Sequence, residues 1–384
     1  MQPTARCSSS PAERWTCREL RSRAARSVRP NRGEPVSVDI HGDAWARGAR
    51  VDHAVNVATG GPPDWLRALL RSELDSALSA YPDETAAAAA IARRHGRDPG
   101  EVVLLNGAAH GFTLIAETLG ARRPIVVHPQ FTEPDRALAA AGSPAAPVIL
   151  SDPYTLDPAV IPDDADLVVI GNPTNPTGVL HPRAAIRAIM KPGRTVVVDE
   201  AFMDFAPGEP ESLAESADEG LIVVRSLTKI LAVPGLRVGY LLAAPALAQR
   251  LRDRRQAWPV NGLALAAARA AVDHPERLHA TAQRAQADRA VLHAVVTEAL
   301  PDARVHDGAA NFLLIELGPG QDATALAHAL REQDGIAVRP AATFPGLTER
   351  HLRLTARGGE EDRQLVAALA RRATKPGRSR SAGS

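Results

Sequence analysis

A regular alternation of two kinds of segment between residues 64 and 260 constrains the fold more than any other feature of the chain. Short runs of β-branched and apolar residues are separated by Ala/Leu/Arg-rich stretches such as 86–95 and 112–119. The runs cover residues 101–105, 124–128, 166–170, 195–199 and 221–225. Strands that alternate with helices form a mostly parallel sheet covered by helices on both faces. The sequence therefore predicts an α/β fold.

A second, smaller α+β domain is predicted from the rest of the chain. After residue 260 a long helical stretch precedes an apolar run, a helix and two further runs, at 311–317, 322–333, 336–339 and 351–355. Polar, Arg-rich or Ser-rich ends without apolar periodicity predict disorder. We expect a disordered leader (1–35), an N-terminal segment that joins the small domain (36–63), a large cofactor-binding domain (64–260), the small domain (261–374) and a disordered tail (375–384).

The charge balance limits the class of partner. The 45 basic and 44 acidic residues give a net charge of +1, so the chain has no bulk positive field for nucleic acid or an anionic membrane. Its longest apolar stretches are interrupted by Arg or Pro and cannot span a bilayer. Both cysteines, Cys7 and Cys17, lie in the leader, so the body has no disulfide framework or cysteine-ligated metal site. We expect a small-molecule substrate, a cytoplasmic location and no metal ligands.

Lysine is rare in this chain, which makes each lysine a candidate chemical group. Only Lys191, Lys229 and Lys375 occur among the 45 basic residues, so arginine serves wherever a general cation is needed. An arginine cannot lose a proton and attack a carbonyl, whereas a lysine amine can. Lys191 precedes a Pro-Gly turn and Lys375 lies in the basic tail, whereas Lys229 directly follows a predicted strand. We therefore interpret Lys229 as the reactive amine.

Polar residues follow several of the predicted strands, at the sheet edge where ligands of α/β proteins bind. Residues 106–111 contain small residues at a strand-to-helix junction, which suits a phosphate but also an ordinary turn. Two Asn-Pro pairs in 172–176 hold asparagine side chains in extended segments, although a Pro-rich loop with Asx turns has the same pattern. Asp199 ends a buried strand, where it either meets a cationic ligand or caps a helix.

The strand that ends near residue 225 provides the strongest combination. Ser226, Thr228 and Lys229 follow it directly, and Arg237 comes eight residues after the lysine. A phosphate-bearing aldehyde would use all four, with Lys229 forming the imine and the other three binding phosphate oxygens. Together with an acid for a pyridinium nitrogen, this is the set that pyridoxal phosphate requires.

At this point the sequence resembles a known family over residues 36–372. Asn-Pro-Thr-Asn-Pro-Thr-Gly at 172–178, Asp-Glu-Ala-Phe at 199–202, and Ser-Leu-Thr-Lys with Gly-Leu-Arg-Val-Gly-Tyr within 226–240 are similar to motifs of fold-type-I, pyridoxal-phosphate-dependent aminotransferases. The branch that it resembles contains histidinol-phosphate aminotransferases and the threonine-phosphate decarboxylases of cobalamin biosynthesis.

The resemblance implies a role for individual residues. Lys229 and Asp199 would be catalytic, with Lys229 joined to the cofactor and Asp199 on its pyridine nitrogen. The other implied cofactor contacts are Ala108, Ala109, Phe131, Asn175, Phe202, Ser226, Thr228, Arg237 and Tyr81. The implied substrate contacts are His41, Gly42, Asn56, Asn175, Arg339 and Arg353. The resemblance also implies a homodimer in which Tyr81 reaches the phosphate of the neighbouring site, and it implies that Arg353 grips the substrate carboxylate.

Two positions depart from the family pattern. His110 stands where an acidic residue is usual, which leaves its role open. Phe202 stands where many aminotransferases have a tyrosine, so Asn175 would be the main partner of the ring hydroxyl. His41, Gly42 and Asn56 resemble the substrate-contacting start of the decarboxylases more than that of the aminotransferases.

The expected activity is transamination of a small, phosphorylated amino acid or amine, and decarboxylation of threonine phosphate is the alternative. The same residues support both, because the outcome depends on which Cα bond is held perpendicular to the ring. Two other classes fit less well. A cofactor-binding sensor in a transcriptional regulator would need a DNA-binding module that the leader is too short to build. A nucleotide-binding protein would need a Gly-x-Gly-x-x-Gly or Walker-type loop after a strand.

Overall fold

The computed structural model describes residues 42–373. The predicted leader and tail, Lys375 and His41 lie outside these residues. Within them, no helix is both long enough and apolar enough to cross a membrane.

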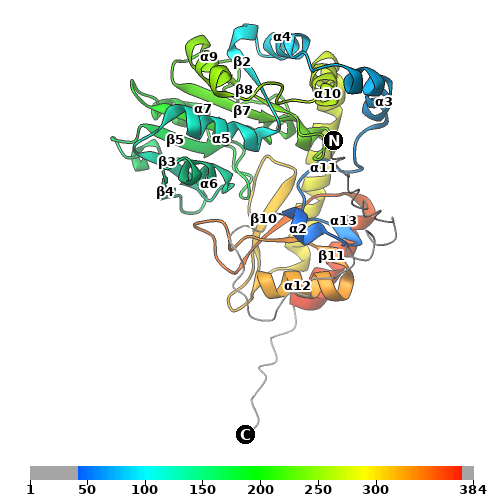
Figure 1. Cartoon of the computed structure of the whole chain (residues 1–384). Helices are drawn as coiled ribbons and strands as arrows, with labels where there is room; N and C mark the ends of the chain where they lie inside the picture. Colours follow the sequence, from blue (N-terminus) through cyan, green and yellow to red (C-terminus); the bar gives the residue numbers. More distant parts are fainter. Residues whose placement is uncertain (1–41, 374–384) are drawn as a thin grey trace, which may run out of the picture. The chain divides into compact units, whose positions relative to one another are not determined.

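A seven-stranded sheet forms the centre of the fold (Figure 1). Five neighbouring strands run parallel, and β8 pairs antiparallel with a strand on each side. The predicted, mostly parallel sheet is therefore confirmed. In spatial order the strands are β2 (Val102–Leu105), β8 (Gly239–Ala243), β7 (Leu221–Ser226), β6 (Thr195–Asp199), β5 (Leu167–Gly171), β3 (Pro124–His128) and β4 (Ala146–Ile149).

Side-chain alternation along the strands separates two apolar layers. In β6, Val196 and Val198 join one hydrophobic cluster and Val197 joins the other, as expected when successive residues point to opposite faces. Both clusters are covered by helices, which confirms the predicted layers. One face of the sheet is covered by α5 (Ala108–Leu119), α6 (Glu133–Ala140) and α9 (Pro245–Arg254). The other face is covered by α3 (Asp64–Ser79), α4 (Thr85–Arg94), α7 (Arg183–Ala188), α8 (Leu227–Ile230), α10 (Gly262–Asp273) and α11 (Pro275–Ala299).

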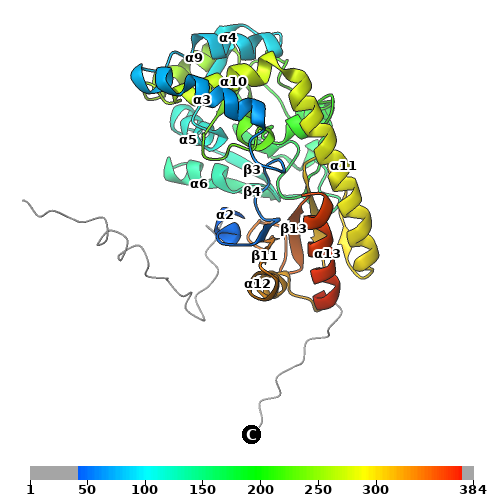
Figure 2. The same cartoon turned by 90° about the vertical axis from the view of Figure 1, so that its right-hand side faces the viewer.

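A smaller, antiparallel sheet is built from the C-terminal part of the chain. Its spatial order is β12 (Arg339–Pro340), β13 (His351–Thr355), β10 (Phe312–Glu316) and β9 (Arg304–Val305). The helices α12 (Ala323–Asp334) and α13 (Gly359–Ala373) pack against each other, and α11 runs beside α13 (Figure 2). This region thus combines a small sheet with helices, as predicted.

The N-terminal segment contributes to this C-terminal region. After α2 (Gly42–Ala46), β1 (Val51–Asp52) pairs in parallel with β11 (Ile336–Ala337). The prediction of one strand at 336–339 is wrong, because β11 and β12 are separate strands with different partners. The domain boundaries stay a prediction. The helix α10 lies after the predicted boundary at residue 260, yet it packs against α3 and α4, which lie before that boundary.

Candidate active site

Lys229 lies where the chain leaves the carboxyl end of β7 and enters α8. Its Nζ donates a hydrogen bond of 3.4 Å to Oδ1 of Asn56 and stands 5.9 Å from the centre of the Phe202 ring. Desolvation, and then the positive charges of Arg353 and Arg237, lower the pKa of the amine to about 8. At neutral pH, a much larger fraction of this amine is unprotonated than for an exposed lysine, as a nucleophile requires.

Asp199 ends the neighbouring strand, β6, and faces the same site. Its Oδ1 accepts a hydrogen bond of 3.1 Å from the Ala201 amide. Desolvation raises the pKa of the Asp199 carboxyl to about 6, while the Ala201 amide and the charge of Lys229 act in the opposite direction. A carboxylate in such surroundings becomes more stable when a cationic ligand group pairs with it.

The predicted phosphate contacts converge at the junction of β2 and α5. Gly107 has a φ of +78° there, and a Cβ on it would come within 2.3 Å of Nη2 of Arg237. The backbone of this turn and the Arg237 guanidinium therefore approach each other in a way that needs glycine. The first residues of α5, Ala108 and Ala109, follow directly and present the free amides of a helix N-terminus.

Two hydroxyls belong to the same end of the sheet. Ser226 is the last residue of β7 and Thr228 lies in α8, and their hydroxyl oxygens are 2.8 Å apart. Both side chains are buried. The strands β2 and β7 both pair with β8, which brings Ser226 near the start of α5. Gly239 of β8 pairs with Ser226, and a Cβ placed on Gly239 would be 3.1 Å from the amide nitrogen of Ala108.

Arg353 reaches the site from β13. Its Nη1 donates to Oδ1 of Asn175 over 2.5 Å, and its Nη2 donates to the carbonyl oxygen of Ala54. The guanidinium is buried and lies 5.3 Å from the centre of the Phe312 ring, and its Nε has no hydrogen-bond partner in the part of the chain that the structure describes. Desolvation, with the charge of Arg339, lowers its pKa to about 9.

Arg339 lies directly opposite Arg353 across the antiparallel pair of β12 and β13. It donates to the carbonyl oxygen of Pro340 and to the hydroxyl of Thr343, each over 2.8 Å. Its guanidinium lies 5.1 Å from the centre of the Phe344 ring, and burial lowers its pKa to about 10. Two like charges that face each other in a sheet destabilise it, so this pair favours an anionic ligand.

The predicted aromatic contacts differ in their surroundings. Phe202 is buried and packs edge-on against Phe312, with ring centres 5.1 Å apart. Phe202 thus lies between Lys229 and β10, the strand that pairs with the Arg353-bearing strand β13. Phe131 is half-buried and packs against the helix-covered core, 6.5 Å from Phe112.

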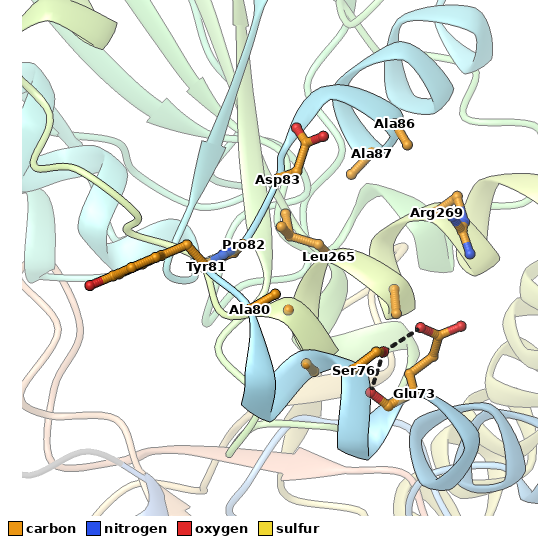
Figure 3. Close-up of a pocket in the computed structure, with 13 residues that line it drawn as sticks. Glu73, Ser76, Ala80, Tyr81, Pro82, Asp83, Ala86, Ala87, Leu265 and Arg269 are labelled. Atoms are coloured by element: carbon orange, nitrogen blue, oxygen red, sulfur yellow. Dashed lines mark hydrogen bonds between the residues drawn. The ribbon is translucent and has the colours of Figure 1, made fainter.

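Tyr81 stands apart from these residues, in the link between α3 and α4. Its side chain is 77% exposed and stacks on Trp258 with ring centres 4.5 Å apart. A pocket of about 180 Å³ lies beside this link. Figure 3 shows the Tyr81 ring pointing away from the other labelled lining residues. No other predicted site residue lines this pocket.

The structure also gives contacts for Asn56, Gly42 and His110, and it adds Ala54, which the sequence did not single out. Asn56 was predicted as a substrate contact, and its hydrogen bond is to Lys229 itself. The carbonyl of Ala54 holds Arg353, and Gly42 packs there so closely that a Cβ would be 2.5 Å from this oxygen. His110 accepts a hydrogen bond from the Asn106 backbone amide through Nδ1, so its side chain contacts the backbone between β2 and α5.

Comparison with known proteins identifies relatives over most of the chain. Residues 52–370 match the family described as aminotransferase class I and II. A histidinol-phosphate aminotransferase of Mycobacterium tuberculosis is 45% identical over 346 residues, which cover 88% of this chain and 92% of the relative. A threonine-phosphate decarboxylase of Salmonella typhimurium is 31% identical over 332 residues, covering 83% and 90%.

The fold has solved counterparts. The crystal structure of a histidinol-phosphate aminotransferase from Sinorhizobium meliloti in complex with pyridoxal 5'-phosphate superposes with a TM-score of 0.76. The superposition covers 89% of this chain and 98% of that one, at 22% identity. This likeness concerns the fold.

Proposed function

Because the chain belongs to the class I and II aminotransferases, which are pyridoxal-phosphate-dependent enzymes, we propose that it transfers an amino group from a small, phosphorylated amine or amino acid. The observation that carries this proposal is that the Lys229 amine and the Asp199 carboxylate lie at the ends of neighbouring strands, while the buried Arg353 guanidinium of the small sheet lies close enough to Lys229 to lower its pKa. The relative that is 45% identical is named a histidinol-phosphate aminotransferase, which supports a phosphorylated amine as the donor.

The residues present fit pyridoxal phosphate. When bound, the cofactor supplies an electron-accepting ring to the bond that breaks beside the substrate nitrogen. Asp199, with its raised pKa, matches a protonated ring nitrogen. The close approach of Gly107 to Arg237 matches a phosphate held by the backbone of 108–109, the hydroxyls of Ser226 and Thr228, and the Arg237 guanidinium.

Lys229 has two tasks in this proposal. Its amine would hold the cofactor, and once free it would move the proton at the substrate Cα through Nζ. A pKa of about 8 suits both tasks near neutral pH. Asn56 orients Nζ through its Oδ1 and limits the positions from which the amine can reach the substrate.

The paired arginines define the substrate. Arg353 and Arg339 occupy facing positions on one side of the small sheet, and burial disfavours the charge of both. A ligand with two anionic groups neutralises both charges at once, whereas a ligand with one leaves a buried guanidinium without a partner. Arg353 would bind a carboxylate and Arg339 the second anionic group.

Decarboxylation of a phosphorylated amino acid is the second candidate. A substrate such as threonine phosphate carries a carboxylate and a phosphate and engages both arginines together. The 31% identical threonine-phosphate decarboxylase supports this reading. Histidinol phosphate has no carboxylate, so for that donor Arg353 would serve the 2-oxo acid that receives the amino group.

One experiment separates the two candidates. The purified enzyme with pyridoxal phosphate is incubated with histidinol phosphate plus 2-oxoglutarate, or with threonine phosphate alone, and the products are identified by mass. We expect glutamate from the first mixture. Formation of 1-amino-2-propanol phosphate from the second, with no glutamate from any donor, would promote the decarboxylase.

A homodimer belongs to the same proposal. Leu74 and Leu78 on α3, together with Tyr81 and Trp258, are large hydrophobic side chains with exposed fractions from 41% to 77%. Apolar groups in this number on neighbouring surfaces are typical of a protein interface. Tyr81 would then reach the phosphate in the partner's site. A cytoplasmic location also stays a prediction.

A further inference from the structure

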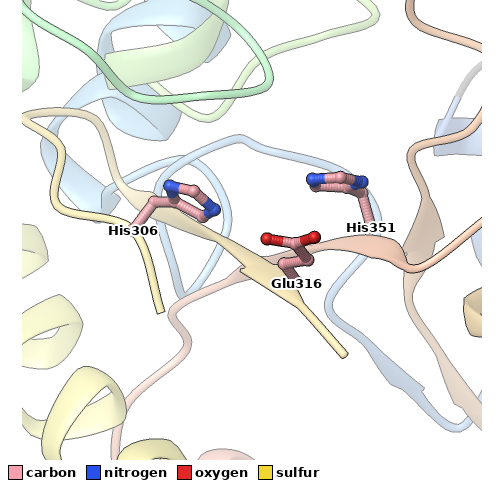
Figure 4. A group of neighbouring side chains, drawn as sticks. All are labelled: His306, Glu316 and His351. Carbon is pink, nitrogen blue, oxygen red and sulfur yellow. The ribbon is translucent and has the colours of Figure 1, made fainter. Parts of the chain in front are cut away.

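Two histidines and a glutamate meet at one end of the four-stranded sheet. His306 follows β9, Glu316 ends β10 and His351 begins β13, and the pairing of Glu316 with His351 places them directly opposite. One ligand atom from each of the three lies within 4.8 Å of the others. Figure 4 shows the two imidazole rings on either side of the Glu316 carboxylate.

His306 has a nitrogen without a partner in this cluster. Its side chain is 6% exposed, and its Nε2 is buried and forms no hydrogen bond with any residue in the described range 42–373. Its Nδ1 lies 3.4 Å from Oδ1 of Asp152. A carboxylate at Nδ1 holds the proton there and leaves the lone pair on Nε2, which is the arrangement found behind metal-binding histidines.

The contacts of His351 are compatible with metal binding through Nε2. Nε2 of His351 has only a contact of 3.4 Å to the Tyr154 hydroxyl, and its Nδ1 lies 3.0 Å from the Thr348 hydroxyl and 3.1 Å from the Thr348 amide. Ligation through Nε2 moves the ring proton to Nδ1, where the Thr348 hydroxyl accepts it and the amide contact is given up. Burial lowers the pKa of both histidines.

Glu316 supplies the negative charge. It is partly exposed and pairs with Arg350 through Oε1. Carboxylate oxygen and neutral imidazole nitrogen are a ligand set that zinc binds tightly.

We propose that His306, Glu316 and His351 form a binding site for a divalent transition metal ion of the zinc type. Zinc holds N and O ligands at about 2.0 to 2.2 Å, so tetrahedral ligand atoms stand about 3.4 Å apart. The ligand atoms need to close by up to about 1.4 Å to reach this spacing, by rotation of the partly exposed Glu316 side chain and small shifts of the two buried rings. Three protein ligands leave a fourth position for water.

The site would connect the two sheets. Asp152 and Tyr154 belong to the segment after β4 of the seven-stranded sheet, whereas the three ligands belong to the four-stranded sheet. His351 and Arg353 are two residues apart on β13 and therefore point to the same face. A bound ion would fix the end of the strand that carries Arg353.

Cobalt(II) is the probe for the test, because its visible absorption reports the number and kind of its ligands. Untagged, full-length holoenzyme is treated with a chelator, dialysed and titrated with Co²⁺, and Zn²⁺ is then added as a competitor. We expect one tetrahedral-type spectrum per chain, its displacement by Zn²⁺ and a higher melting temperature with Zn²⁺. Titration without these visible bands would overturn the proposal.

Variants assign the ion to these residues. His306→Gln, Glu316→Gln and His351→Gln should each abolish the bands, and Asp152→Asn should weaken binding by about 10- to 100-fold. The exposed His279→Gln and the Cys7→Ser/Cys17→Ser double variant should bind as wild type does. Absorption of the bound pyridoxal phosphate checks that each variant is folded. Bands that persist in all three ligand variants, or vanish in the cysteine variant, would contradict the assignment.

Discussion

Nη1 of Arg353 lies 2.5 Å from Oδ1 of Asn175, and this hydrogen bond joins the small sheet to the loop after β5. The family resemblance implied a substrate contact for both residues and, for Asn175, an additional contact with the cofactor ring. Their direct contact means that binding of a carboxylate at Arg353 must compete with, or reposition, the Asn175 amide.

We therefore expect Arg353→Lys to lower kcat/KM for the carboxylate-bearing substrate by about 100-fold, because lysine keeps the charge but loses the planar fork. The half-reaction with 2-oxoglutarate should be affected more than that with histidinol phosphate. Single-turnover rates for each half-reaction measure this. The exposed Arg371→Lys is the matched control. Equal losses in both half-reactions would count against a carboxylate at Arg353.

Replacement of Lys229 should abolish turnover. The turnover rates of Lys229→Ala and Lys229→Arg should both be lower than that of the wild type by more than about 10,000-fold. Arginine keeps a charge but has no amine that can lose its proton. Borohydride treatment of the wild type should leave a stable cofactor adduct on Lys229, read by peptide mass. The control is Lys191→Arg, which should remain active. An adduct on Lys191 would refute the assignment.

Capture of pyridoxal phosphate by the cofactor-free enzyme should depend on pH through the Lys229 amine. The pKa of this amine is lowered to about 8, so its neutral form is the major one above pH 8 and falls about tenfold per unit below it. The capture rate should rise up to pH 8 and then level off. Arg353→Ala removes a positive charge that lowers this pKa, so its midpoint should lie higher. A midpoint unchanged in the variant would contradict this electrostatic account.

Asp199→Asn should keep the cofactor but lose activity by about 100- to 1,000-fold, because an amide cannot supply the negative charge that stabilises a protonated ring nitrogen. The absorption spectrum of the bound cofactor reports binding, and steady-state kinetics report the loss. Asp199→Glu retains the charge and should recover part of the rate. Wild-type turnover in Asp199→Asn would mean that Asp199 only caps the turn after β6.

Mixed dimers test the predicted role of Tyr81. Tyr81→Ala and Lys229→Ala proteins, each weakly active or inactive alone, are unfolded together and refolded as a mixture. If Tyr81 completes the partner's site, half of the mixed dimers' sites receive Lys229 and the partner's Tyr81 intact, and activity returns. Sedimentation should show a dimer for both variants. If dimers form but activity does not return, Tyr81 does not contribute to the neighbouring site.

Local pattern was enough to predict four of the five parallel strands of the large sheet. β3 and β6 coincide with the predicted runs, because a strand that is buried on both faces needs a continuous apolar, β-branched sequence. The edge strand β4 was missed because Pro147 and exposed neighbours weaken this signal. β8 was missed because its run begins at Gly239 and continues the apolar stretch from Leu236.

The parts of the site that depend on distant segments could not be predicted in this way. The bond between Asn56 and Lys229 joins residues that are separated by 173 positions, and no local pattern encodes their distance. The single predicted run at 336–339 divides between two sheets because the choice of partner is tertiary. Residue types identified the chemistry of Lys229 and Asp199, whereas their pKa values depend on burial and neighbouring charges.

The parallel pairing of β1 with β11 has a consequence for how the protein is made. Val51 is synthesised early, but its partner Ile336 leaves the ribosome only when most of the chain is complete. The seven-stranded sheet, whose last strand ends at Ala243, has all its strands long before that. The growing chain must therefore carry an unpaired N-terminal strand while its centre folds, and it gains the strand that bears Arg353 last. A nascent chain that stops short of β13 should hold the Lys229 amine without Arg353, the arginine that we propose to bind the substrate carboxylate.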